Sequence, residues 1–104
     1  MSGDWVGRLR EAVRCGRVEW KMHALERMLE RGIGRREVLA TLEAGEVIER
    51  YPERRPFPAV LLLGGLRRPL HVVAAYDAGE DRCHVVTAYR PSAERFHEDW
   101  KTRR

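Results

Sequence analysis

The hydrophobic pattern of the chain changes its period at Gly45. Before this residue, apolar side chains recur every three or four positions, as on one face of an α-helix. After it, short runs rich in β-branched and aromatic residues alternate with Pro- and Gly-containing turns, which is typical of strands. Helices followed by strands predict an α+β fold with an antiparallel sheet. We expect four strands, with the helices packed on one face of the sheet.

The bounds of these elements follow from their punctuating residues. Helices are expected from about residue 5 to 15, at 22–31 and at 35–44, and strands at 46–51, 59–63, 69–76 and 83–89. Residues 18–21 are expected to be a short link. Residues 92–100 form a short segment capped by Ser92. On the second helix, the buried face is predicted to consist of Met22, Leu25, Met28 and Leu29.

Arginine dominates the charged residues. The 104 residues include 20 basic side chains against 16 acidic ones, and only Lys21 and Lys101 are lysines. Residues 1–49 are neutral overall, so the net charge of +4 lies entirely in the second half. Guanidinium groups suit phosphate and stay charged near neutral pH, although a GC-rich genome would give the same bias. We expect a polyanion as the partner of the second half.

Several protein classes do not fit the sequence. The longest apolar run, residues 59–63, is far shorter than the ~18 residues of a membrane span. No signal peptide is visible, and Cys15 and Cys83 make neither a disulfide framework nor a zinc pattern. We expect a single cytoplasmic domain over residues 1–104, with no metal, no cofactor and no membrane partner.

Histidines set among arginines are the residues that could carry chemistry, since no P-loop or serine-nucleophile motif is present. RNA can be cut without a metal, because its 2′-hydroxyl is the nucleophile and the protein supplies only proton transfer and positive charge. We assign proton transfer to His71 or His23 and phosphate stabilisation to Arg27 and Arg90. Tyr89 would hold or protonate the leaving group.

Each candidate also has a structural explanation. His71 stands among apolar residues and fits a hydrogen-bonded core histidine equally well. His23 and Arg27 fit a solvated helix face, and Tyr89-Arg90 fits the rim of a strand end. The basic residues Arg54, Arg55, Lys101, Arg103 and Arg104 are ordinary surface singly, but together they favour RNA binding.

The register of the last hairpin bears on this assignment. If Tyr76 and Cys83 close the loop between the last two strands, His71 lies opposite Ala88, and Tyr89 points to the other face. A single bulge would reverse part of this arrangement.

Five short motifs together resemble the bacterial family known as domain of unknown function 4258. They are His23-Ala24-x-x-Arg27-Met28-x-x-Arg31-Gly32-Ile33, Gly45-Glu46-Val47-Ile48-Glu49-x-Tyr51-Pro52, Leu62-Leu63-Gly64, Pro69-Leu70-His71-Val72-Val73 and Val86-Thr87-x-Tyr89-Arg90-Pro91. The resemblance covers about residues 20–101. That family is similar to the RelE-like and motility-quorum-sensing-regulator toxins, which are small α+β ribonucleases with a barnase-like architecture.

The resemblance implies the toxin of a type II toxin–antitoxin pair, which cleaves mRNA, free or on the ribosome, through a 2′,3′-cyclic phosphate. It implies a zinc-finger or DNA-binding antitoxin as a partner. Carried over by position, it points to Tyr51 or Arg50 on the first predicted strand, and again to Arg90, as site residues that contact RNA. Lysines do much of this work in those toxins, so arginine and histidine would replace them here. Two alternatives stay open: a non-catalytic RNA- or protein-binding module of the same fold, and an enzyme acting on a small acidic substrate.

Overall fold

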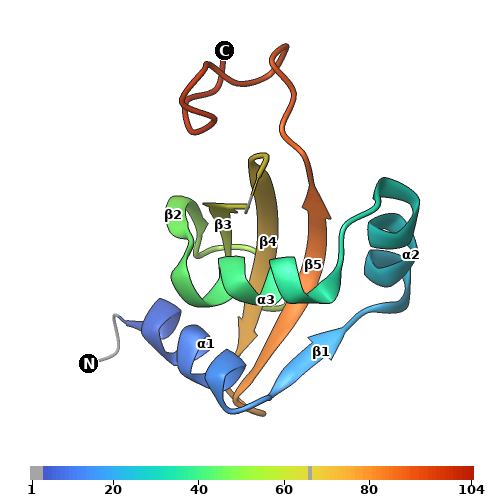
Figure 1. The fold of residues 1–104 in the computed structure, drawn as a ribbon. Helices are drawn as coiled ribbons and strands as arrows, with labels where there is room; N and C mark the ends of the chain where they lie inside the picture. The colour runs from blue at the N-terminus through green and yellow to red at the C-terminus, as the bar shows by residue number, and fades with distance from the viewer. Residues whose placement is uncertain (1–3, 66) are drawn as a thin grey trace.

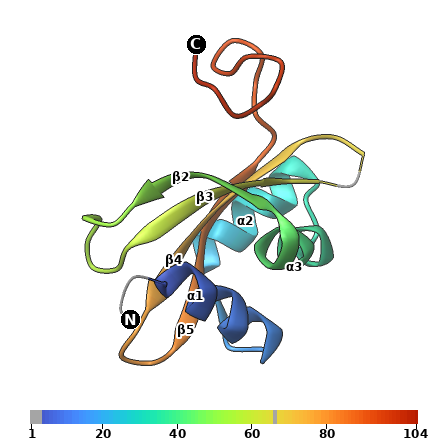
Figure 2. The same cartoon turned by 90° about the vertical axis from the view of Figure 1, so that its left-hand side faces the viewer.

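The computed structural model describes residues 4–65 and 67–104 and shows an α+β fold (Figure 1). In chain order the elements are α1 (Trp5–Arg14), β1 (Val18–Trp20), α2 (Met22–Arg31), α3 (Arg35–Ala44), β2 (Glu46–Tyr51), β3 (Ala59–Gly64), β4 (Leu70–Asp77) and β5 (Arg82–Tyr89). The strands form one sheet in the order β1-β5-β4-β3-β2. Figure 2 shows the three helices on one side of this sheet, as the sequence predicts.

The prediction of four antiparallel strands is wrong, because the sheet is mixed and has a fifth strand. Val18–Trp20, expected to be a link, pairs in parallel with β5, with Val18 opposite Cys83 and Trp20 opposite Val85. Three residues are too few to reveal an alternating pattern, so only their neighbours in space identify them as a strand.

The apolar face of α2 is also rotated from the predicted one. Ala24 and Met28 are buried, whereas Met22 and Leu29 are 72% and 83% exposed. The helix packs mainly against β5, near the edge of the sheet, where only a narrow contact is available. Ala24 and Met28, one turn apart, fill that contact, and Leu25 packs half-buried beside it, so only Met22 and Leu29 of the expected apolar face stay in solvent.

A bulge changes the register of the last hairpin. Tyr76 pairs with Cys83 as predicted, but the pairing shifts between Val73 and Ala74. His71 therefore lies opposite Tyr89 instead of Ala88, which corrects the expected register. Because directly paired residues point to the same side of a sheet, His71 and Tyr89 share one face.

The core lies between the helices and one face of the sheet. It includes Leu9 of α1, Val38 and Leu42 of α3, and Val72 and Val85 of the central strands, all fully buried. No helix among residues 4–65 and 67–104 is long and apolar enough to cross a bilayer.

The last residues form neither a helix nor a long strand. Residues 92–104 make turns that close on an isolated bridge between Phe96 and Arg103. This tail, red in Figure 1, lies beyond the end of β5 and folds back over the start of β4, where the Trp100 carbonyl meets His71.

Candidate functional site

The sheet face away from the helices, hereafter the open face, carries the polar candidates. The pairing places His71 beside Leu63 of β3 and Tyr89 of β5. On β2, Glu49 and Tyr51 pair with Leu61 and Ala59, on the same face. A polar group built from β2, β4 and β5 therefore collects on the open face, although the chain order separates its members by up to 40 residues.

His71 and Tyr89 form the centre of this group. The Nδ1 atom of His71 lies 3.3 Å from the hydroxyl oxygen of Tyr89, and its Nε2 atom lies 2.7 Å from the carbonyl oxygen of Trp100. A carbonyl can only accept, so Nε2 carries the proton in the neutral ring. Nδ1 is then free to accept the hydrogen bond that the Tyr89 hydroxyl donates, which gives a tyrosine–histidine–carbonyl chain.

Burial shifts the pKa values of both His71 and Tyr89. It lowers the pKa of His71 below its ordinary value, while the Trp100 carbonyl opposes the shift. Burial also raises the pKa of Tyr89. At neutral pH the pair is therefore an uncharged imidazole that accepts a hydrogen bond from an uncharged phenol. The unprotonated Nδ1 of this imidazole can take up a proton.

The tail closes over His71 from the side. The ring of Phe96, itself buried, meets the His71 ring edge-on at 4.6 Å between centroids, and the Arg103 guanidinium lies over Phe96 at 5.0 Å. Arg103 also donates two hydrogen bonds to Glu49, at 2.7 and 3.0 Å. These bonds lower the pKa of Glu49, which in turn accepts from the Tyr51 hydroxyl.

A cavity of about 460 Å³ opens beside Tyr89 and is hereafter the arginine cavity. Its lining consists of Arg31, Tyr89, Arg90, Ser92, Arg95, Phe96 and Arg103. Arg31, the last residue of α2, is anchored by a 2.9 Å hydrogen bond from its Nη1 to the carbonyl of Ala88. Several guanidinium groups around one space make an environment suited to the oxygens of a phosphate.

Arg90 lines this cavity, but its guanidinium is already engaged. It donates two 2.9 Å hydrogen bonds to the two carboxylate oxygens of Glu37 on α3, and a further contact reaches the carbonyl of Arg68. The Glu37 carboxylate offsets its charge, so Arg90 joins the end of β5 to α3. Arg31 and Arg95 are better placed for the phosphate role that the sequence assigned to Arg90.

His23 and Arg27 lie apart from the His71–Tyr89 pair. Arg27 is exposed on α2, with its Nε 3.9 Å from a carboxylate oxygen of Glu30. His23 lies in the first turn of α2 and lines a separate cavity of about 230 Å³, which also contains Arg54 and His84. The structure thus separates His23 and Arg27 from the other predicted catalytic residues, and Arg27 lines neither cavity.

The remaining predicted RNA contacts are scattered. Arg50 pairs with Val60, whose side chain faces the helices, so Arg50 leaves the open face. Arg55 is exposed in the loop after β2. Lys101 lies 3.3 Å from a carboxylate oxygen of Glu46, and Arg104 donates to two carbonyls of its own tail. Of the three basic tail residues predicted, only Arg103 lines the arginine cavity.

The sequence did not identify Arg95, Phe96 and the Trp100 carbonyl as parts of the site. They lie in a segment without a periodic pattern, and only the folding back of the tail brings them to His71. Arg31 had a signal, since it stands in the first of the five quoted motifs. Glu49 had one too, because Glu49-x-Tyr51 on a strand places both side chains on one face.

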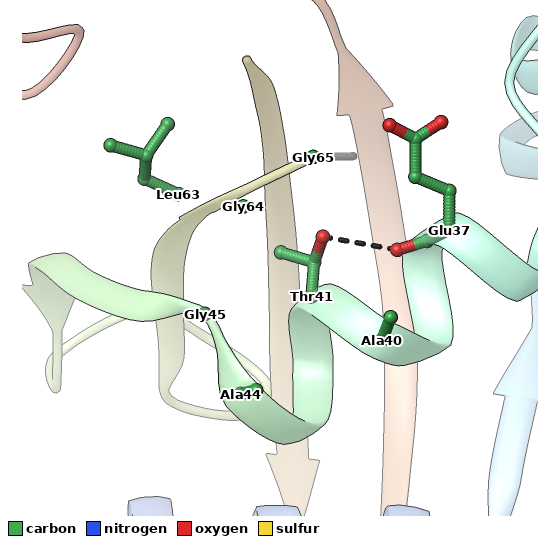
Figure 3. Close-up of a pocket in the computed structure, with 8 residues that line it drawn as sticks. All are labelled: Glu37, Ala40, Thr41, Ala44, Gly45, Leu63, Gly64 and Gly65. Atoms are coloured by element: carbon green, nitrogen blue, oxygen red, sulfur yellow. Dashed lines mark hydrogen bonds between the residues drawn. The ribbon is translucent and has the colours of Figure 1, made fainter. Parts of the chain in front are cut away.

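A third cavity, of about 250 Å³, lies between α3 and β3 (Figure 3). Its lining is mostly small residues, and its one charged residue, Glu37, is bound to Arg90. A Cβ at Gly64 would come within 2.4 Å of the Thr41 hydroxyl, so glycine lets α3 approach the strand closely. We interpret this hollow as a packing feature. In the described part of the chain, no cluster of His, Cys, Asp and Glu could hold a metal ion.

Comparison with known proteins identifies the family. No curated protein and no solved structure matches the chain significantly. A family model does match, over residues 20–90, a range that runs from the end of β1 to the residue after β5 and includes both His71 and Tyr89. It ends before the tail that covers them. The chain belongs to the family described as Domain of unknown function (DUF4258).

Proposed function

We propose that this protein is a metal-independent endoribonuclease that cleaves single-stranded mRNA through a 2′,3′-cyclic phosphate. The observation that carries the proposal is the Tyr89 hydroxyl, held on Nδ1 of His71 and facing a cavity lined by arginines. Such a site combines a proton acceptor with positive charge, which is what this reaction asks of a protein.

The reaction would use the pair as a relay. The phosphate would lie between Arg31 and Arg95, because Glu49 already binds the guanidinium of Arg103. The 2′-hydroxyl would give its proton to the Tyr89 oxygen as the phenol proton moves to Nδ1 of His71. The Trp100 carbonyl would stabilise the resulting imidazolium through Nε2–H. The 2′-oxygen attacks phosphorus, the bond to the 5′-oxygen breaks, and the pair returns its proton to that oxygen. Arginine stabilises the charge on the pentavalent phosphate.

Two further features support an RNA ligand. The excess positive charge of the chain lies after residue 49, in the half that supplies most of the arginine cavity. The α+β layout, with helices on one face and an open sheet face carrying the site, is compatible with the RelE-like architecture implied by the resemblance.

The direct test is to incubate the full chain with a long single-stranded RNA in EDTA and to map the ends. Tyr89→Phe removes the relay hydroxyl but keeps the ring, and we expect cleavage to fall at least ~100-fold. Arg31→Gln should weaken RNA binding and cleavage. His97→Gln is the matched control, because His97 is exposed on the tail.

Four outcomes decide between the candidate functions. Cyclic-phosphate ends that disappear in Tyr89→Phe support the relay. Cleavage that Tyr89→Phe leaves at the full rate refutes it. RNA bound tightly and never cut, either free or on ribosomes, would instead favour the non-catalytic binding module. Growth arrest on expression of the native chain, absent with Tyr89→Phe, would support the toxin role.

A toxin of this kind requires an inhibitor, and we propose a small zinc-finger or DNA-binding antitoxin as the partner. The exposed Met22 and Leu29 on α2 offer apolar side chains to such a partner. Co-expression with the product of the adjacent reading frame should relieve growth arrest. Failure of every neighbouring product to do so would count against the antitoxin.

A further inference from the structure

A second cavity on the open face lies at the opposite end of α2 from the arginine cavity. We call it the His84 cavity; it measures about 230 Å³ and is lined by Lys21, His23, Arg54, Pro56, Phe57, Ala75, His84 and Val86. The residue before α2 and one in its first turn belong to this cavity, whereas Arg31, the last residue of α2, belongs to the other. Ten helical residues span about 15 Å, which sets the separation of the two cavities.

His84 is a buried histidine without a hydrogen-bond partner. The residue is 9% exposed, and neither ring nitrogen makes a hydrogen bond with any described group. Its ring stacks on Phe57 at 5.1 Å between centroids, and the closest carboxylate oxygen, on Asp77, is 3.6 Å from Nε2. Buried polar atoms are nearly always paired in folded proteins. A ligand in the cavity would supply the missing partner.

The start of α2 adds an anion site to the same space. Lys21 is the N-cap residue, its backbone is extended, and no side chain caps the first turn. No acidic residue stands in that turn either. The amides of a helix N-terminus and the helix dipole favour a negative group, and the side chains of Lys21 and Arg54 supply positive charge at the same place.

The remaining lining is apolar and partly aromatic. Phe57 and Pro56 come from the loop between β2 and β3, while Ala75 and Val86 come from the open face. The cavity is smaller than the ~300 Å³ at which pockets for drug-sized ligands begin. It therefore suits one flat ring with one anionic group.

We propose that the His84 cavity binds one nucleotide of the RNA strand whose scissile phosphate lies in the arginine cavity. Its phosphate would meet the start of α2 with Lys21 and Arg54, and its base would lie against the apolar lining, with His84 hydrogen-bonding to the base edge. This inference rests on the proposed function. The length of α2 would then fix the distance between the two bound parts of the RNA, because a short single strand would occupy both ends of the helix at once.

The test begins with binding, without any cleavage. Nucleoside monophosphates, the matching nucleosides and inorganic phosphate are titrated into the full chain and followed by NMR. We expect the monophosphates to shift signals of His23, His84 and the first turn of α2, and to bind more tightly than either fragment. Lys21→Gln should weaken them about tenfold, as for one charge-assisted contact. Arg14→Gln, which removes a charge from α1, should have no effect.

His84→Phe is a second variant that keeps the aromatic stack while removing the ring nitrogens, and it should reduce affinity and selectivity among bases. The inference is overturned if shifts map only to Arg31 and Tyr89, if phosphate binds as tightly as nucleotides, or if Arg14→Gln weakens binding as much as Lys21→Gln.

A pentanucleotide should bind more tightly than a monophosphate and be weakened by Lys21→Gln and Arg31→Gln alike. Equal affinities would refute the shared strand and indicate a site for free nucleotides.

The two proposals fail in different ways. If monophosphates bind at His84 while Tyr89→Phe leaves RNA cleavage unchanged, the catalytic proposal fails and the nucleotide site stands. If cleavage depends on Tyr89 but Lys21→Gln and His84→Phe bind and cut RNA normally, the nucleotide site fails and the catalytic proposal stands.

Discussion

His71 is a buried imidazole whose neutral form is favoured by its surroundings. Apolar contacts with Phe96 and burial under the tail lower its pKa, although the Trp100 carbonyl would stabilise the charged ring. Its hydrogen bonds to Tyr89 and Trp100 hold the ring in one tautomer. The proposed proton transfer and the stability of the fold therefore both depend on the protonation of His71.

We predict that His71 makes the protein less stable in mild acid. Below the ordinary histidine pKa of ~6.5, the unfolded chain takes up a proton that folded His71 resists, so the free energy of unfolding should fall as the pH drops from 7.5 to 5. His71→Gln should flatten this slope, because glutamine does not titrate. Urea unfolding at several pH values measures it. His97→Gln should keep the slope of the native chain, and an unchanged slope in His71→Gln would contradict the assignment.

The tail acts as a structural unit because Phe96 is its buried anchor. The ring is 2% exposed and lies between His71 and the guanidinium of Arg103, which reaches on to Glu49. Apart from the hydrogen bond between His71 and the Trp100 carbonyl, the other bonds of the tail lie at or near the surface. Lys101 contacts Glu46, and Arg104 donates to the carbonyls of Ala93 and Phe96. Exposed ion pairs contribute little to stability, so the anchoring depends chiefly on one side chain.

Phe96→Ala should therefore loosen the tail and expose His71. We expect the free energy of unfolding to fall by roughly 2–3 kcal/mol, less than for a residue deep in a core, because the tail can move away and leave no cavity. The pKa of His71 should rise toward its ordinary value as water reaches the ring. An NMR titration of the His71 ring measures this. Phe57→Ala, at the other end of the open face, should leave the His71 pKa unchanged; a similar rise in both variants would show general loosening instead.

The elements that the sequence predicts best are those bounded by glycine. The second and third helices and the first predicted strand match α2, α3 and β2, since Gly32, Gly34 and Gly45 mark their ends. β1 was missed because three residues carry no period. The bulge in β5 was not predictable either, and it decides whether Tyr89 joins His71. A shift of one residue in the pairing of β4 with β5 thus decides whether the predicted site places Tyr89 beside His71.

The site was less predictable than the fold. Its strand residues follow from pairing once the bulge is known, but Arg95, Phe96 and Trp100 reach it through tail turns with no repeating pattern. Arg90 is of the expected residue type and lies beside the expected site, yet Glu37 of α3 binds its guanidinium. Charge partners of this kind depend on the packing of distant elements, which a local reading of the sequence does not contain.

The positions of the basic side chains on the folded chain predict how the affinity for RNA depends on salt concentration. The two cavities of the open face bring together Arg31 and Arg95 at one end of α2, and Lys21 and Arg54 at the other. For single-stranded RNA, each neutralised phosphate changes the slope of log affinity against log salt by about −0.7, so four contacts give about −3. A strand confined to the arginine cavity would use only two of these cations and give about half that slope.

Fluorescence anisotropy with a labelled, uncleavable 2′-deoxy strand at several salt concentrations measures this slope. Lys21→Gln and Arg31→Gln should each make it shallower by about 0.7, because each removes one phosphate contact. Arg14→Gln carries the same change in net charge on the helix side, and its slope should equal that of the native chain. If all three variants alter the slope equally, binding follows the net charge of +4 and not the two cavities. Only a slope that depends on position supports a strand lying along α2.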